Sequence, residues 1–160
     1  AATTTTTVGK VHKGKETERK PIVEIAAAHN IPYAASASIS YYADLQRKLK
    51  KAAAMTGPRF ITISAPCCLG AGFDGGLTMR VAKMQVMSRL WFLFEYENGK
   101  FTLNFDAANP KPVKEYLGMQ KRFKHLTDDQ IQHIQNMADA QYNKFKALAA
   151  ASNVQAVPAK

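Results

Sequence analysis

The sequence predicts an α/β fold: a doubly wound, mostly parallel sheet that carries an antiparallel hairpin extension and a C-terminal helix. Three observations predict it. Helical and β-prone segments alternate through the first half, a strong hairpin signal follows, and a long amphipathic segment comes last. The 160 residues are 46% hydrophobic and 21% charged, which suits one domain with a sizeable core. We expect that domain to span residues 1–148 and residues 149–160 to form a flexible tail.

The first half is predicted to contain two helices that alternate with two strands. In order, we expect a loop at 1–17, a helix at 18–29, a strand at 33–38, a helix at 41–55 and a strand at 60–65. Pro21 suits the first turn of the first helix, and Ser40 is the expected N-cap of the second. Their inward faces are predicted at Ile22, Ile25, Ala26 and His29, and at Leu45, Leu49, Ala52 and Ala53. The strand at 60–65 is β-prone throughout, so we expect it to be central in the sheet.

The second half is predicted to add a helix, a hairpin and the terminal helix. A Gly-rich loop at 66–76 leads into a helix at 77–90, whose inward face is predicted at Val81, Met84, Val86 and Met87. Strands at 91–96 and 100–105 flank Asn98-Gly99, the strongest kind of short hairpin turn. A short helix is expected at 113–117, and a capping-box-like start at Thr127 predicts the terminal helix. The inward face of that helix is predicted at Ile131, Ile134, Met137, Ala138, Gln141, Tyr142, Phe145 and Leu148.

The chain is strongly basic, with a formal net charge of +10. Such a charge invites a nucleic-acid interpretation, but aromatic residues are not interleaved with the basic clusters in a stacking pattern. We therefore expect no nucleic-acid partner, and instead solvated faces, subunit contacts or an acidic protein partner. The apolar run at 90–94 is far too short to span a membrane, and no leader pattern is visible. These features predict a cytoplasmic protein with no membrane partner.

The two cysteines, Cys67 and Cys68, are adjacent, and they form neither a C-x-x-C pair nor a zinc motif. Cys67 is the strongest candidate for a site residue, because it lies where a buried strand is predicted to end in a Gly-rich loop. Open α/β sheets place ligands at that end of their strands. A thiolate there can bind iron while backbone N–H groups donate hydrogen bonds to sulfur. Two alternatives stay open: a buried, inert cysteine, and a thiol-redox protein that uses both cysteines.

Five stretches, taken in chain order, resemble the C-terminal half of the β subunits of pyruvate (2-oxoacid):ferredoxin oxidoreductases, also called pyruvate synthases. They are Thr3–Thr6 with Val8-Gly9-Lys10, Ala28–Tyr33 with Ala37-Ser38-Ile39, Ala65-Pro66-Cys67, the hairpin Trp91–Phe101, and Pro112–Thr127. The resemblance extends from residue 1 to about residue 146. It implies that the α/β domain is the C-terminal part of a thiamine-diphosphate-binding domain.

The resemblance implies a subunit or fragment of an enzyme that oxidatively decarboxylates pyruvate or a related 2-oxoacid to acyl-CoA and CO₂. The reaction is reversible, and its electrons pass through 4Fe–4S clusters to ferredoxin. The implied cofactors are thiamine diphosphate, Mg²⁺ and a 4Fe–4S cluster, all requiring residues outside this chain. The implied partners are the other subunits of a heteromeric complex, ferredoxin, the 2-oxoacid and coenzyme A.

By the same resemblance, Cys67 is the fourth cysteine ligand of a 4Fe–4S cluster held by the family's β subunit. Cys68 stands where the family usually has proline. The family's Gly-Asp-Gly motif and its other three cysteine ligands are absent from this sequence, so we expect the isolated chain to be catalytically silent. The rival interpretation is a non-catalytic basic α/β module that binds an acidic protein or nucleic acid.

Overall fold

A computed structural model describes residues 19–154, which form four strands and eight helical segments. In chain order these are α1 (Ile22–Ala28), β1 (Tyr33–Ser38), α2 (Tyr42–Ala54), β2 (Arg59–Ser64), α3 (Cys68–Ala71), η1 (Gly75–Leu77), α4 (Thr78–Met87), β3 (Phe94–Glu97), β4 (Lys100–Leu103), α5 (Val113–Gly118), η2 (Lys121–Phe123) and α6 (Asp128–Val154). The expected loop at 1–17 and the expected helix start at residue 18 lie outside the described residues.

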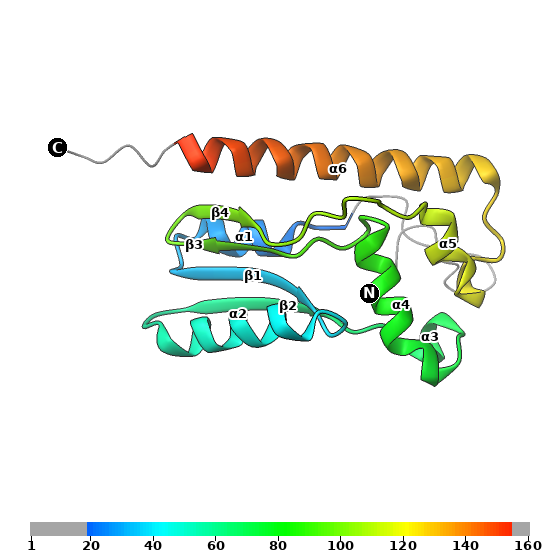
Figure 1. Ribbon diagram of the computed structural model, residues 1–160, viewed down its shortest axis with the longest axis horizontal. Coiled ribbons are helices and arrows are strands. Elements are labelled where there is room, and N and C mark those ends of the chain that lie inside the picture. Colours follow the sequence, from blue (N-terminus) through cyan, green and yellow to red (C-terminus); the bar gives the residue numbers. More distant parts are fainter. Residues whose placement is uncertain (1–18, 155–160) are drawn as a thin grey trace.

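The four strands form one mixed sheet in the order β2-β1-β3-β4 (Figure 1). β1 and β2 are parallel and are joined by α2, whereas β1 pairs with β3, and β3 with β4, in antiparallel register. Asn98 and Gly99 turn the hairpin with φ of 49° and 80°, as their sequence predicts. The α/β class and the antiparallel hairpin extension are thereby confirmed, and of the three pairings in the described sheet one is parallel.

The prediction that the strand at 60–65 is central is wrong for the described sheet. β2 occupies an edge, and β1 lies in the interior with all six of its residues buried. The alanines and serines of β1 leave room for helices to pack closely on both of its faces. The β-branched residues of β2 indicate a buried strand, but they do not specify which strands pair with it.

Helices cover both faces of the sheet, as a doubly wound fold requires. On one face α1 and α6 pack against the strands through Val23, Ala34, Phe94, Phe101 and Phe145. On the other face α2 packs against β1 through Ala35 and Ala52. Figure 1 shows α6 running along one side of the molecule and α2 along the opposite side.

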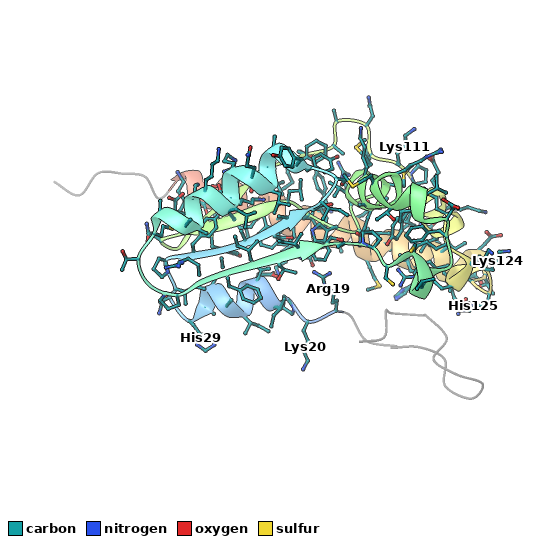
Figure 2. All side chains as sticks on the ribbon, turned by 90° about the horizontal axis from the view of Figure 1, so that it is seen from below. Arg19, Lys20, His29, Lys111, Lys124 and His125 are labelled. Atoms are coloured by element: carbon teal, nitrogen blue, oxygen red, sulfur yellow. The ribbon has the colours of Figure 1, made fainter. Side chains whose placement is uncertain are left out.

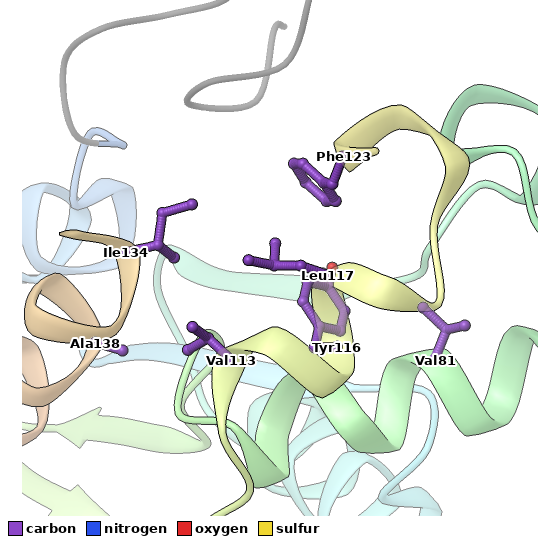
Figure 3. Close-up of a cluster of buried hydrophobic side chains, with 7 residues drawn as sticks. All are labelled: Val81, Val113, Tyr116, Leu117, Phe123, Ile134 and Ala138. Atoms are coloured by element: carbon purple, nitrogen blue, oxygen red, sulfur yellow. The ribbon is translucent and has the colours of Figure 1, made fainter. Parts of the chain in front are cut away.

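A second apolar cluster joins α4, α5, η2 and α6 beyond the end of the sheet (Figure 3). Its buried members are Val81, Val113, Tyr116, Leu117, Phe123, Ile134 and Ala138. The inward faces predicted for the helix at 77–90 and for the terminal helix are confirmed, since none of their predicted residues is exposed. α6 continues to Val154, past residue 149, where a tail was expected to begin.

Two predicted helix faces are correct only in part, since Ala26 and Ala52 pack against the sheet but other predicted residues do not. In α1 the predicted inward residues Ile22 and Ile25 are 42% and 43% exposed and His29 is exposed as well, while Val23 is buried. The helix has only seven residues, so packing of Val23 onto the sheet fixes its rotation more strongly than a pattern spread over twelve residues.

Among the helices of the described residues, none is both long and apolar enough to cross a bilayer.

In α2 the predicted apolar stripe is only partly correct, because Ala52 is buried but Leu49 and Ala53 are exposed. Leu49 is 47% exposed, whereas Lys48 on the neighbouring position is fully buried. Ser40 does not cap this helix: Tyr41 occupies the N-cap position without a side-chain hydrogen bond, and the Ser40 hydroxyl instead lies 3.0 Å from the Ser38 hydroxyl. The error follows from a charged residue taking an inward position, which hydrophobic periodicity assigns to leucine.

Candidate functional site

The candidate site is the turn that follows β2, where Ala65 and Pro66 lead into Cys67. Cys67 has an extended backbone (φ −87°, ψ 115°) and occupies the N-cap position of α3. Its side chain is exposed, and the Gly70 N–H donates a hydrogen bond to the Cys67 Sγ with an N···S distance of 3.4 Å. The inert-cysteine alternative required a buried Cys67, and the structure contradicts it because Cys67 is exposed.

Cys68 begins α3 and is only partly exposed. A Cβ atom added at Gly75 would lie 3.9 Å from the Cys68 Sγ, so the Gly-rich loop folds back over this second thiol. The adjacent thiols thus differ in surroundings: Cys67 faces outward with a donated hydrogen bond, and Cys68 is partly covered by the loop.

Gly72 ends α3 in the left-handed conformation, with φ of 71°. A Cβ at this position would come within 2.9 Å of the Lys121 Cβ, so both the backbone conformation and the close approach require glycine here. The Lys121 N–H donates to the Gly72 carbonyl at 3.3 Å. Because η2 is anchored in the second apolar cluster through Phe123, this contact fixes the cysteine turn against a packed part of the molecule.

Asp74 has a structural role in the same loop. Its carboxylate accepts a hydrogen bond from the Gly76 N–H at 2.8 Å and caps η1. This hydrogen bond indicates that Asp74 caps the short helix.

Exposed apolar and basic side chains surround the turn in sequence and space. Leu69, which follows the two cysteines, is 91% exposed, and Leu77 and Met79 are also exposed. Lys121 contacts the turn at Gly72. Figure 2 shows Lys111 and Lys124 at the same end of the molecule as the short helix that follows β2. The end of the molecule that carries Cys67 therefore combines apolar and positively charged surface.

The residues at this turn fit one ligand of an iron–sulfur cluster and no complete metal site. An outward thiol that receives a backbone N–H···S hydrogen bond has the features of a cluster ligand. Within residues 19–154, however, no three His, Cys, Asp or Glu side chains gather to hold a metal ion. The chain has two cysteines, so a cluster held by four thiolates needs at least two from another stretch of protein.

A second polar cluster lies between α2 and the sheet, and sequence reasoning missed it. Glu95 of β3 is only 4% exposed. It accepts hydrogen bonds from Tyr33 at 2.5 Å, from Arg47 at 3.0 Å and from Lys51 at 3.1 Å. Burial by itself raises the pKa of Glu95, but these hydrogen bonds outweigh it and lower the pKa to about 2. Glu95 is thus a buried anion that ties α2 to the hairpin.

Lys48 completes this cluster, with its side chain fully buried. Its ammonium donates to the Asp44 carboxylate and to the Ser36 carbonyl, each at 2.7 Å. Burial lowers the pKa of Lys48, while Asp44 favours its charged form. Glu97, which shares the strand face with Glu95, binds Lys51 at 2.7 Å. The two glutamates therefore face basic side chains of α2 and tie the hairpin to that helix.

Comparisons with known proteins relate this chain to subunits of oxidoreductases. No family model matches the chain. It is 44% identical to the pyruvate synthase subunit PorB of Methanocaldococcus jannaschii over 139 residues, 87% of this chain and 47% of that subunit. It is 44% identical to PorB of Methanosarcina barkeri over 151 residues, 91% of this chain and 51% of that subunit.

A third relative has a different named substrate. The ketoisovalerate oxidoreductase subunit VorB of Pyrococcus abyssi is 40% identical over 151 residues, which are 93% of this chain and 49% of that subunit. The chain spans about half the length of the curated relatives it matches. The resemblance expected from sequence is thereby confirmed, and the chain belongs to the family of PorB- and VorB-type oxidoreductase subunits, corresponding to about half of one such subunit.

Proposed function

We propose that this chain forms part of the β subunit of a 2-oxoacid:ferredoxin oxidoreductase. The complex would convert pyruvate or a related 2-oxoacid, with coenzyme A, to acyl-CoA and CO₂, and would also run in reverse. The names of the relatives support this proposal over a general binding module. The single observation that connects this proposal to a particular site is the exposed Cys67 thiol. It lies at the end of β2 and accepts a hydrogen bond from the Gly70 N–H.

In this proposal Cys67 supplies one thiolate to a 4Fe–4S cluster whose other ligands come from outside this chain. When bound, such a cluster accepts and donates single electrons. The Gly70 N–H stabilises negative charge on the Cys67 sulfur, because a hydrogen bond to sulfur favours the more reduced and more negative state. The Gly72–Lys121 contact holds the turn so that this sulfur keeps its outward position.

Thiamine diphosphate and Mg²⁺ are assigned to other parts of the complex. The Gly-Asp-Gly motif that the family resemblance associates with the metal and the diphosphate is absent from this sequence, which supports placing both groups elsewhere. We propose that those groups are held by polypeptide outside this chain, and that the complex is cytoplasmic. Exposed Lys111, Lys121 and Lys124 support an acidic electron-accepting partner such as ferredoxin, because complementary charge accelerates encounter.

A chimeric subunit tests the proposal. The 139 matched residues of the M. jannaschii PorB subunit would be exchanged for those of this chain, and the subunit assembled with its natural partners. We expect reduction of methyl viologen that depends on both a 2-oxoacid and coenzyme A. The isolated 160-residue chain is the matched control and should show none.

Pyruvate, 2-oxoisovalerate and 2-oxoglutarate should each be assayed, because the relatives differ in substrate. A chimera that assembles fully but reduces the dye with none of them would refute the proposed function. Turnover by the isolated chain would refute the view that its site is incomplete.

A further inference from the structure

The residues that follow Cys67 fall into a buried group and an exposed group. Ala71 is 1% exposed, and Phe73 packs against the second apolar cluster. Cys67 is exposed, and so is Leu69, two residues further along in α3. The buried residues therefore anchor the turn to the rest of the molecule, while Cys67 and Leu69 stand on its free surface.

Leu69 is solvated to an unusual degree for an apolar side chain. It is 91% exposed, whereas two other exposed leucines, Leu49 of α2 and Leu77 of η1, are 47% and 38% exposed. A single apolar side chain on a protein surface is ordinary. This one, however, projects almost whole into solvent two residues after the candidate cluster ligand. Its position, together with its exposure, marks Leu69 as a side chain that contacts whatever Cys67 binds.

Gly70 leaves free space next to the Cys67 sulfur. The Gly70 N–H donates to the Cys67 Sγ at 3.4 Å, and a Cβ atom added at Gly70 would lie 3.6 Å from that sulfur. Any longer side chain at this position would stand beside the sulfur. With glycine there, a group bound to the Cys67 Sγ can extend across the surface of α3 toward Leu69.

We propose that Leu69 packs against the iron–sulfur cluster that Cys67 binds and excludes water from it. This inference rests on the proposed function, because it needs Cys67 to be a cluster ligand. Two residues of backbone span at most about 7 Å, which is comparable with the width of a four-iron cluster. Covering Leu69 removes apolar surface from water, so burial of this side chain favours cluster binding.

Exclusion of water by Leu69 has a defined electronic consequence. Reduction adds a negative charge to a cluster that its thiolate ligands already make negative, and water stabilises that charge. Solvent exposure is one of the factors that set the reduction potential of a cluster, and an apolar surrounding limits the access of solvent. Leu69 therefore makes the cluster harder to reduce, so that the electrons it passes on are more strongly reducing.

A redox titration of the assembled complex that contains the chimeric subunit tests this role. The relevant cluster is identified as the one whose paramagnetic resonance signal Cys67→Ala removes. At a fixed applied potential, Leu69→Ala should raise the ratio of reduced to oxidised cluster at least about threefold, because water reaches the cluster. Leu69→Ile keeps an apolar side chain of the same size and should restore the wild-type ratio. Leu49→Ala is the control for loss of an exposed leucine and should change nothing.

Electron spin-echo measurements in D₂O give a readout that does not depend on enzyme activity. Exchangeable deuterons close to the reduced cluster modulate the echo, so the depth of the modulation reports the access of water. Leu69→Ala should deepen the modulation at least about twofold relative to wild type, and Leu69→Ile should not.

The outcomes separate this inference from the proposed function. A complex with no cluster signal that depends on Cys67 would refute the proposed role of the turn, and the inference with it. If the signal is present, and Leu69→Ala alters neither the redox ratio nor the deuterium modulation, the inference alone is wrong. Weaker assembly of Leu69→Ala with both readouts unchanged overturns it as well, because Leu69 then contacts protein and not the cluster.

Discussion

Replacing Cys67 by alanine in an assembled complex that contains this chain is expected to remove one iron–sulfur cluster, roughly four iron atoms per complex. Alanine is chosen because its side chain has no atom that can bind iron. The physical reason is that Cys67 presents its sulfur outward with a donated N–H bond from Gly70. Dye reduction driven by a 2-oxoacid should fall with the iron, because the lost cluster lies on the proposed electron path.

Cys68→Ala is the matched control, since it removes the neighbouring thiol from the same turn. Cys68 is partly covered by the loop at Gly75, so its loss should leave the iron content unchanged. Iron analysis and low-temperature electron paramagnetic resonance of the reduced complexes measure both variants. Retention of every cluster by Cys67→Ala, with loss in Cys68→Ala, would reverse the assignment of the ligand.

Glu95→Gln is expected to lower the free energy of unfolding by about 3 kcal/mol at pH 7, since the pKa of Glu95 lies at about 2, well below the usual 4.5. The folded state favours the ionised carboxylate through Tyr33, Arg47 and Lys51. A carboxyl group with a lowered pKa stabilises the fold above its unfolded-state pKa. That stabilisation is lost as the pH falls toward the folded-state value.

The pH dependence separates this charge effect from a packing effect. The wild-type chain should lose stability between about pH 5 and pH 2, whereas Glu95→Gln should show a flatter profile over that window. Glu115→Gln, on an exposed position of α5, is the control and should behave as the wild type does. Urea unfolding at stepped pH gives the measurement. Parallel profiles for wild type and Glu95→Gln would mean that the carboxylate is not held ionised by its neighbours.

Elements whose causes are local were predictable from sequence. β1 was predicted at its observed bounds because Asn30-Ile31-Pro32 ends the preceding helix and a short run of mostly small residues follows it. The hairpin follows from Asn98-Gly99, whose backbone conformation few other residues adopt. The position of Cys67 at a strand end followed from the Gly-rich loop after a β-prone run. In each case the determining chemistry lies within a few residues.

Features that depend on distant residues were not predictable. The burial of Lys48 depends on the Ser36 carbonyl reaching it across the helix–sheet interface, and the role of Glu95 depends on α2 lying above the hairpin. The place of β2 at an edge of the described sheet depends on which strands pair, and the side chains of β2 do not specify that. Glu95 stands in register with Ala35, on the sheet face that α2 covers, and that register is visible only in the folded chain.

The most direct test of the central claim is electron–nuclear double resonance on a complex in which only this chain carries cysteine labelled with ¹³C at Cβ. The chain would be the Cys68→Ala variant, so that Cys67 is its one labelled cysteine. If Cys67 binds the cluster, the reduced complex will show a hyperfine coupling from that carbon to the cluster electron spin. A fully loaded, active complex without such a coupling would contradict the assignment of Cys67 as a cluster ligand.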